Sequence, residues 1–323
     1  MTTRILVLGA GGFIGTHLCA ALAAEGWDTI GFGRGERPAE LAGVPGVSWI
    51  RGDLGDRALL RRALEGCRVA VHLVGSTAPA GAGTDPVTEL QADLAGGVGL
   101  LEAVREAGVG RVVFASSGGT VYGLTGDGPV PETAPTEPLC SYGIVKLAFE
   151  KYLALHRHLH GLDYRVLRIA NVFGERQRVR RQQGVIAAFM TAAVEGRPLE
   201  VWGDGSVVRD YVYIGDVVDA LVRAARLPVV AHRVVNIGSG AGRSLTEVID
   251  GITRLRRTHG ARPPEVVHRP GRRVDVPRIV LDIARAREAL GWEPATPWEE
   301  ALTRTHRWYA AEAAEVGVLA AAG

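Results

Sequence analysis

The sequence is poor in cysteine and has almost no excess charge of either sign. Its three cysteines, Cys19, Cys67 and Cys140, are scattered along 323 residues and lack the short spacings of a metal site. Dispersed thiols in odd number suit a reducing compartment, so we expect a cytoplasmic protein with no bound metal. A formal net charge of +2 provides no strong field for a nucleic acid or a membrane surface, and neither is expected as a partner.

Long apolar stretches, internal repeats and low-complexity tracts are also missing from the sequence. No stretch is long enough to cross a bilayer, and the apolar run after Arg4 breaks into glycines without the cleavage pattern of a secretion signal. Apolar residues nevertheless make up 47% of the chain. A chain of this length can therefore bury a large core, as one α/β unit or as a main domain with a smaller one attached.

The first fifteen residues have the pattern of a dinucleotide-binding turn. Residues 4–8 predict a buried parallel strand, and Gly9, Gly12 and Gly15 then lead into a helix that we expect to stop at Gly26. Glycines at this spacing permit a tight turn, close approach of a pyrophosphate to backbone N–H groups, and packing of the helix on the strand. We expect contacts with the cofactor from these glycines and from Phe13, Ile14, Leu54, Leu73 and Val74.

The end of the second predicted strand, residues 29–32, bears on the choice between NAD and NADP. An acidic residue there would bind the ribose hydroxyls of NAD, but this chain has Gly33 and Arg34, with Arg37 close behind. A guanidinium in place of a carboxylate favours NADP, although Arg34 could also stack on the adenine or be solvated. Asp53 follows the third strand, where it could bind the adenine amino group or stabilise a turn.

Strands and helices alternate through the first half of the chain. Strands are predicted at 47–50, 69–74, 111–115 and 166–169, with a long helix at 86–107. This repetition predicts a doubly wound parallel sheet, whose ligands lie at the carboxyl ends of the strands. His72 lies within an apolar strand and is interpreted as a packed, hydrogen-bonded histidine rather than a catalyst.

A tyrosine and a lysine four residues apart are the strongest catalytic candidates. Tyr142 and Lys146 would lie on one face of a helix, where the ammonium could lower the pKa of the phenol and allow proton exchange with an alcohol near neutral pH. Residues 116–123 follow the strand at 111–115 and include two serines and a threonine, and we call them the hydroxyl segment. Their hydroxyls would face the nicotinamide, close to Tyr142. Ser117 or Thr120 could there hydrogen-bond the substrate oxygen, or the serines could satisfy backbone groups of a glycine-rich turn.

Taken together, these features resemble an extended short-chain dehydrogenase/reductase of the kind that includes UDP-galactose 4-epimerases and nucleotide-sugar dehydratases. The resemblance runs nearly end to end, through the opening glycines, Asp53, the segment 116–123, Tyr142 and Lys146, and the segments 168–174, 203–216, 281–282 and 291–292. It implies a Rossmann-type fold with a smaller C-terminal α/β domain that binds a nucleotide-diphosphate sugar. Residues 1–170 would mainly bind NAD(P) and residues 171–323 mainly the sugar nucleotide, with some later segments returning to the first domain. Tyr142 would be the acid and base, and Lys146 would bind the nicotinamide ribose.

Three further residues are expected to bind the substrate. Asn171 follows a strand and can hold a sugar or phosphate oxygen. Arg209 lies in an apolar strand, where a buried guanidinium needs an anion, either the diphosphate or a pairing with Asp210 or Asp216. Arg272 is preferred over Arg269 as a second diphosphate ligand, although relatives in the family often have an acid at the position of Arg272. The polar segment 177–183 could cover an anionic substrate or simply be solvated.

The expected reaction is epimerisation at C4 of a UDP-sugar through a 4-keto intermediate, with the hydride stored on the bound nicotinamide. The alternative is an NADPH-dependent reductase of a keto sugar, which the loss of the strand-2 carboxylate favours. A dehydratase is less favoured, because Gly118 and Gly119 stand where dehydratases commonly have an acidic pair. A cofactor-sensing protein would not need the pair of Tyr142 and Lys146. The family commonly dimerises through helices near 86–107 and 141–160, so a homodimer is expected.

Overall fold

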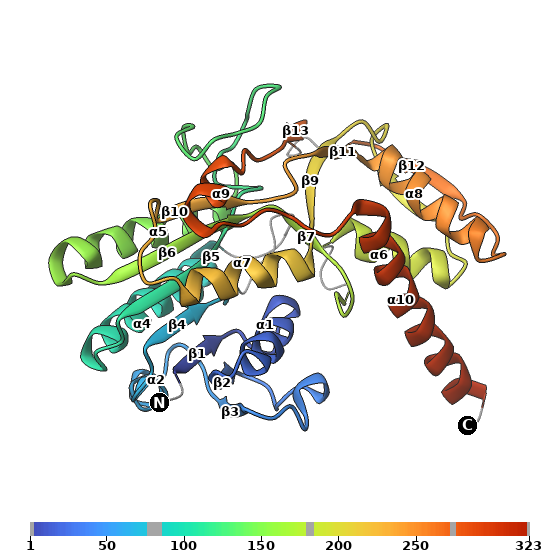
Figure 1. The fold of residues 1–323 in the computed structure, drawn as a ribbon. Coiled ribbons are helices and arrows are strands. Elements are labelled where there is room, and N and C mark those ends of the chain that lie inside the picture. The colour runs from blue at the N-terminus through green and yellow to red at the C-terminus, as the bar shows by residue number, and fades with distance from the viewer. Residues whose placement is uncertain (1–2, 76–85, 179–183, 272–275, 322–323) are drawn as a thin grey trace.

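A seven-stranded sheet in which neighbouring strands all run parallel is the main feature of the molecule (Figure 1). The computed structural model describes residues 3–75, 86–178, 184–271 and 276–321. The strand order is β10-β6-β5-β4-β1-β2-β3. The strands are β1 (Arg4–Leu8), β2 (Asp28–Gly33), β3 (Val47–Arg51), β4 (Val69–His72), β5 (Arg111–Ser117), β6 (Asp163–Ile169) and β10 (Val234–Ile237). The predicted Rossmann-type parallel sheet is confirmed.

Helices cover both faces of this sheet, because successive side chains of a strand point to opposite sides. Ile5 and Val7 of β1 belong to an apolar cluster with α1 (Phe13–Ala24) and α7 (Ile214–Arg226). Leu6 and Leu8 belong to a second cluster with α2 (Arg57–Leu64), α4 (Gly96–Glu106) and α5 (Ser141–His160). Among the described residues, no helix has the length and apolar character that crossing a bilayer requires.

The C-terminal half adds two small sheets and three helices at one end of the molecule, on the right in Figure 1. One sheet has the order β11-β9-β13, with β7 also paired to β9, and the other pairs β12 with β8. Their strands are β7 (Asn171–Phe173), β8 (Leu199–Trp202), β9 (Val208–Tyr213), β11 (Gly242–Ser244), β12 (Val266–Arg269) and β13 (Arg278–Ile279). The helices are α6 (Val185–Val194), α8 (Leu245–Thr258) and α10 (Trp298–Ala321).

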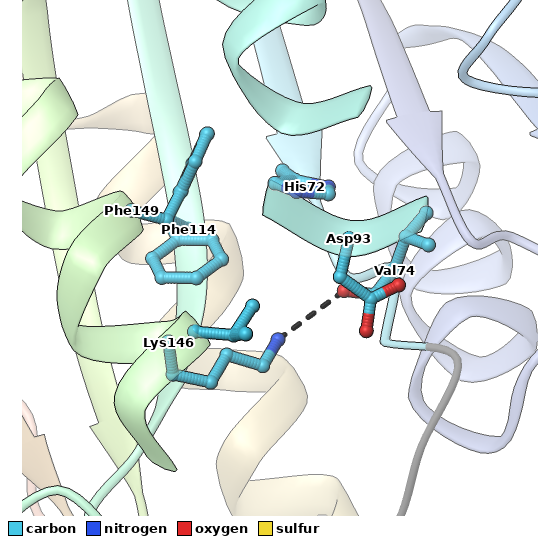
Figure 2. A pocket seen from close by; sticks show the side chains of 7 residues that line it. His72, Val74, Asp93, Phe114, Lys146 and Phe149 are labelled. Carbon is cyan, nitrogen blue, oxygen red and sulfur yellow. Dashed lines mark hydrogen bonds between the residues drawn. The ribbon is translucent and has the colours of Figure 1, made fainter. Parts of the chain in front are cut away.

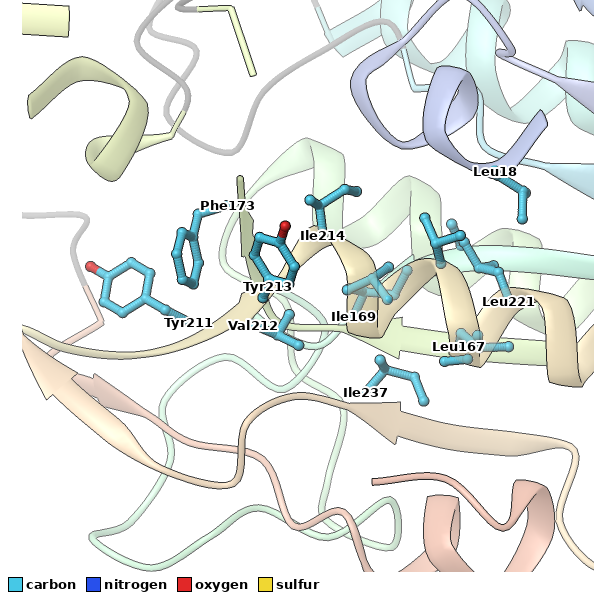
Figure 3. Packing of buried hydrophobic residues seen from close by; sticks show 14 of the residues in the cluster. Leu18, Leu167, Ile169, Phe173, Tyr211, Val212, Tyr213, Ile214, Leu221 and Ile237 are labelled. Atoms are coloured by element: carbon cyan, nitrogen blue, oxygen red, sulfur yellow. The ribbon is translucent and has the colours of Figure 1, made fainter. Parts of the chain in front are cut away.

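One apolar cluster runs from the large sheet into this C-terminal part (Figure 3). β9 continues directly into α7, and residues of both elements belong to the cluster, Val212 and Tyr213 from β9 and Ile214 and Leu221 from α7. Figure 3 shows Leu167 and Ile169 of β6 beside α7, and Phe173 of β7 next to Tyr213 of β9. The two sheets therefore share a core, which holds the residues between them in register.

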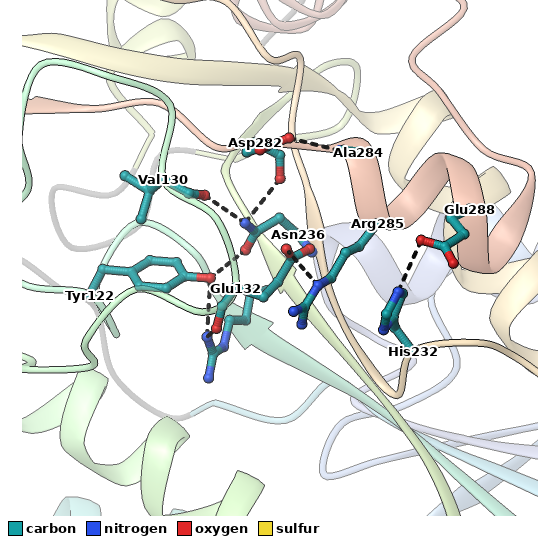
Figure 4. A network of polar contacts seen from close by, with 10 residues as sticks. Tyr122, Val130, Glu132, His232, Asn236, Asp282, Ala284, Arg285 and Glu288 are labelled. Atoms are coloured by element: carbon teal, nitrogen blue, oxygen red, sulfur yellow. Dashed lines mark hydrogen bonds and ion pairs between the residues drawn. The ribbon is translucent and has the colours of Figure 1, made fainter.

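A strand from late in the chain also completes the large sheet. β10 pairs with β6, and its Asn236 is fully buried. The Asn236 side chain donates to the carbonyl oxygens of Val130 and Asp282 and accepts a 2.6 Å hydrogen bond from the Tyr122 hydroxyl (Figure 4). The segment before α9 (Ala284–Leu290) and the loop that follows Tyr122 are thus fastened to the sheet through one amide.

The predicted helix at 86–107 is interrupted. The structure has a short helix α3 (Pro86–Glu89), a π-helical stretch η2 (Leu90–Ala95) and then α4. Within this region Gly97 allows α5 to approach closely, since a Cβ there would lie 2.7 Å from the Phe149 ring. The local helical pattern of the sequence did not predict this π-helical stretch. Smaller errors concern ends of elements, such as β4, which stops at His72 rather than residue 74.

Candidate functional site

The glycine turn after β1 is built as the cofactor prediction requires. Gly9 has a φ of +82°, and a Cβ there would lie 3.2 Å from the backbone nitrogen of Val74. A Cβ on Gly15 would lie 2.3 Å from the carbonyl oxygen of Gly9, so only glycine lets α1 approach the turn. Gly12 caps α1 without a side-chain hydrogen bond, which leaves the amides of the first turn to an anion. The turn therefore suits the pyrophosphate of a dinucleotide.

Arginines follow the end of β2, and two of those nearby have structural partners. The Arg37 guanidinium donates to the carbonyl oxygens of Leu41 and Val44, at the short helix η1 (Ala39–Leu41). Arg51 of β3 forms a 2.6 Å ion pair with Glu36 and also donates to the carbonyl of Arg34. The Arg34 residue itself is exposed.

Two other predicted adenosine contacts lie at the same edge. Asp53 is exposed, and one of its oxygens accepts a 2.9 Å hydrogen bond from the Gly55 amide, the turn role that the sequence left open. Leu54 is buried against α4. Trp49 packs beside the glycine turn, since its ring lies 3.3 Å from where a Cβ on Gly33 would be and 3.5 Å from one on Gly11.

Tyr142 and Lys146 meet at the ends of β4 and β5. A Cβ on Gly75 would lie 3.6 Å from both the Tyr142 ring and the Lys146 ammonium nitrogen, so the two groups border the same point. The Lys146 ammonium donates to the carbonyl oxygens of Val74, at 3.2 Å, and Ala115, at 3.0 Å. These two bonds use two of its three N–H groups and orient the third. The predicted pair on one face of α5 is present.

The phenol of Tyr142 does not have the lowered pKa that the sequence suggested. Burial raises the pKa of Tyr142, and the charges of Asp93 and Cys140 raise it further, while a hydrogen bond with Ser117 lowers it. Burial lowers the pKa of Lys146 to about 8, against the opposing effects of Asp93 and Glu150. The expectation considered only the ammonium four residues away, whereas the apolar surroundings and a carboxylate from another helix dominate.

The two candidate hydroxyls have different environments. Ser117 ends β5 and hydrogen-bonds Tyr142. Thr120 packs against Gly143 of α5, and its hydroxyl is buried with no hydrogen-bond partner among the described residues. Ser117 is thus the hydroxyl that the fold brings to the phenol.

The predicted substrate ligands are partly assembled. Asn171 begins β7 and its side-chain oxygen lies 3.3 Å from where a Cβ on Gly119 would be, next to the hydroxyl segment. Arg209 of β9 is partly buried and faces Arg243 of β11 across the strand pair. The Arg243 guanidinium stacks on Trp298 at 4.3 Å. Sequence reasoning missed Arg243, whose significance depends on the register of two strands.

The two carboxylates that the sequence offered as partners of Arg209 accept hydrogen bonds from other groups, and the Arg209 guanidinium donates to the carbonyl oxygen of Val208 at 3.0 Å. Asp210 accepts hydrogen bonds from Ser239, Gly240 and Leu281, and Asp216 accepts from Ala295 and Thr296. Both carboxylates are therefore satisfied by backbone amides and hydroxyls. Arg272 lies outside the described residues, as does most of the segment 177–183, whereas Arg269 is exposed and paired with Glu200 at 2.8 Å.

His72 is a packed residue, as expected. Its ring lies between Phe114 and Phe149, and burial lowers its pKa to about 3, with Lys146 contributing. The predicted hydrogen bonding is not seen at Nδ1, which is without a partner in the described part of the chain. The imidazole is therefore neutral near pH 7.

Further along α4 and α5, three other side chains come together, of which one is buried, one half-buried and one exposed. Atoms of Glu102, His156 and His160 lie within 4.8 Å of one another, a spacing that could hold a metal ion. Arg105 already donates twice to one oxygen of Glu102, and His156 lies 3.6 Å from the other. This cluster has no connection with the site around Tyr142.

Sequence reasoning also missed Asp93. It lies in the π-helical stretch, is only 8% exposed, and lines a small pocket with Lys146, His72, Val74, Phe114, Val145 and Phe149 (Figure 2). Nothing in its local sequence distinguishes it from a surface aspartate of a helix. Only the packing of α5 against the interrupted helix brings it to the reacting pair.

Comparison with known proteins agrees with this geometry. The model of the NAD dependent epimerase/dehydratase family matches residues 5–238. The chain is 36% identical to the UDP-glucose 4-epimerase of Mycolicibacterium smegmatis, over 95% of this chain and 98% of that protein.

Two solved structures are similar over almost their whole length. The UDP-glucose 4-epimerase of Thermotoga maritima, crystallised with UDP-glucose, has a TM-score of 0.88 at 32% identity, covering 96% of this chain and all of that one. The UDP-glucose 4-epimerase of Thermus thermophilus, in complex with NAD, has a TM-score of 0.86 at 33% identity, covering 95% of this chain and 99% of that one.

Proposed function

The chain belongs to the NAD-dependent epimerase/dehydratase family of extended short-chain dehydrogenases, and from this we propose that it inverts the C4 hydroxyl of a UDP-sugar. The observation that carries the proposal is the meeting of Ser117, Tyr142 and Lys146 beside the strand that bears the glycine turn. The relatives and solved structures named as UDP-glucose 4-epimerases support the choice of a UDP-sugar and of C4.

The three residues divide the proton chemistry between them. Ser117 holds the C4 oxygen against the Tyr142 side chain, whose phenolate oxygen takes the alcohol proton when C4 is oxidised. The resulting phenol returns that proton to the oxygen when the carbonyl is reduced. Lys146 stabilises the phenolate form through its positive charge. The nicotinamide cofactor, when bound, would accept the hydride from C4 and later return it. A 4-keto sugar that turns about its diphosphate link would present its other face, and this accounts for inversion.

The diphosphate is proposed to bind Arg209 and Arg243. Like charges directly opposite each other on paired strands repel, so two guanidiniums at this register are stabilised by an anion between them. Planar guanidiniums also bind phosphate oxygens in pairs. Asn171 is proposed to hold a sugar or phosphate oxygen near Ser117. Arg272 remains a prediction, as do the sugar and the extent of the two domains.

The cofactor is proposed to be NAD, bound through the glycine turn, Phe13 and Ile14, with Lys146 on the nicotinamide ribose. The sequence preference for NADP gains no support from the structure, because Arg37 has structural partners and Arg51 is paired with Glu36. At the end of β2, Gly33 and Arg34 stand where NAD-binding proteins commonly have a carboxylate for the adenosine ribose. They favour the second candidate, an NADPH-dependent reductase of a 4-keto sugar, which would bind and release its cofactor in each turnover.

Measurements of the released nucleotide and of sugar interconversion decide between these functions, and a variant tests the role of Tyr142. Denaturation should release close to one NAD per chain, and the intact protein should interconvert UDP-glucose and UDP-galactose without added cofactor. Tyr142→Phe should lose at least about a hundredfold in turnover while keeping its NAD, because only the proton carrier is removed. A protein free of nucleotide that consumes NADPH with a keto sugar would establish the reductase instead.

We also infer a cytoplasmic homodimer. The three cysteines are free thiols, as expected in a reducing compartment. Large apolar side chains are exposed along one side of α5, including Ile144 at 55%, Leu155 at 45% and Leu159 at 59%. Val87 and Leu90 of the neighbouring interrupted helix are also more than half exposed. A patch of this kind is typical of an interface, and a second copy would cover it.

A further inference from the structure

Asp93 lies in an unusual stretch of helix beside the reacting pair. The stretch Leu90–Ala95 is π-helical, and such turns within α-helices are frequent at functional sites. Figure 2 shows the Asp93 carboxylate on the side of the pocket where the Lys146 ammonium meets the Val74 carbonyl. The remaining walls are largely aromatic or aliphatic, from Phe114, Phe149 and Val145.

A buried ammonium in such surroundings needs a nearby negative charge. Carbonyl oxygens and the Phe114 ring, whose centroid lies 4.8 Å from the ammonium nitrogen, provide only partial charges. Two carboxylates act on Lys146, Asp93 from η2 and Glu150 from its own helix. Glu150 is paired with the Arg168 guanidinium at 2.7 Å and also accepts from Ser116. Its charge is largely compensated, so Asp93 exerts the stronger effect.

We propose that Asp93 is the positioning residue of the reacting pair, and that its carboxylate keeps Lys146 an ammonium and thereby sets the pH range in which Tyr142 exchanges its proton. The role in proton exchange rests on the proposed function. The effect of the Asp93 charge on the protonation of Lys146 does not depend on the proposed function, and it can be measured without a sugar substrate.

Asp93 acts in the same direction on both members of the pair. Burial lowers the pKa of Lys146 and the Asp93 charge raises it, and the resulting pKa of Lys146 is about 8. For Tyr142, burial and the Asp93 charge both raise the pKa. Among the described residues, Cys140 and Glu150 also act on the pKa values of the pair. His72 also faces Lys146, but with a pKa of about 3 it stays neutral across the range of interest. Removing the Asp93 charge should therefore lower both pKa values.

The sequence makes Lys146 easy to titrate, because Lys151 is the only other lysine in the chain. Trace acetylation with acetic anhydride between pH 5 and pH 11, with peptide mass spectrometry, gives the titration midpoint of each lysine. Asp93→Asn removes the charge and keeps the shape, so the Lys146 midpoint should fall by about one pH unit or more. Lys151 is exposed and should not change, which makes it the internal reference. An unchanged Lys146 midpoint in Asp93→Asn would overturn the proposal.

Three further variants keep the test decisive. Asp93→Ser removes the charge in another shape and replaces Asp93→Asn if that variant does not fold. Asp93→Glu retains the charge, so its Lys146 midpoint should stay near that of the wild type. Cys140→Ser, made in both backgrounds, shows whether the thiol contributes.

The pH profile of turnover separates a role in charge from a merely structural one. If Asp93 sets the protonation of Lys146, the alkaline limb of the profile moves to lower pH in Asp93→Asn and returns in Asp93→Glu. A structural role would instead lower the rate by the same factor at every pH, and that result would contradict the proposal. Should the wild type show no epimerisation while the Lys146 midpoint still shifts, the proposed reaction is wrong and the charge relation stands.

Discussion

The hydroxyl that assists Tyr142 can be identified by replacing single residues. Ser117 hydrogen-bonds the phenol, so Ser117→Ala should lower kcat by about a hundredfold with little effect on NAD content. Thr120→Val is the matched control, since the Thr120 hydroxyl is buried without a partner among the described residues. A methyl group there should leave kcat within about threefold and the free energy of unfolding equal or higher, because an unsatisfied hydroxyl is lost. The reverse ranking of the two variants in a kcat assay would assign the role to Thr120.

At this scale the sequence could predict residues whose neighbours are close in the chain. Tyr142 and Lys146 are four positions apart on one helix, and the glycines of the opening turn lie within seven positions, so both groups were found. Asp93 was missed because it reaches Lys146 only through the packing of one helix against another. The effect of burial on the Tyr142 phenol was missed for the same reason.

The helix that carries Tyr142 is fastened to the sheet by a buried ion pair. Glu150 of α5 and Arg168 of β6 are each 5% exposed and lie 2.7 Å apart. Glu150→Gln leaves the guanidinium buried without its charge partner, so the free energy of unfolding should fall by about 3–5 kcal/mol in a urea titration. Glu299→Gln is the control, because its pairing with Arg254 is exposed and should contribute about 0–1 kcal/mol. Equal losses in the two variants would show that the buried pair does not stabilise the helix in its place.

Helices and strands could be predicted from the sequence where a single local pattern of apolar residues and glycines determines them. The strand at residues 4–8 is found where it was predicted, and the strand predicted at 47–50 is one residue longer. The helix at 86–107 was predicted as continuous, because its residues favour a helix throughout. The apolar periodicity did not record the π-helical interruption, nor the close approach of α5 that Gly97 permits in the following helix.

At the scale of the whole molecule, the apolar side of α5 provides a test of the proposed dimer. Leu155 and Leu159 are exposed one helical turn apart, so replacing both with glutamate places two charges in the middle of the patch. Burying those charges in an interface would be unfavourable, and sedimentation velocity should show the change from two copies to one. Val229→Glu is the control, because Val229 is 81% exposed on a loop elsewhere and should leave the assembly unchanged.

The site of each copy is built from its own described residues, so the separated variant should keep most of its turnover per chain. A wild-type protein that sediments as one copy at micromolar concentration would contradict the dimer, and the exposed leucines would then need another explanation.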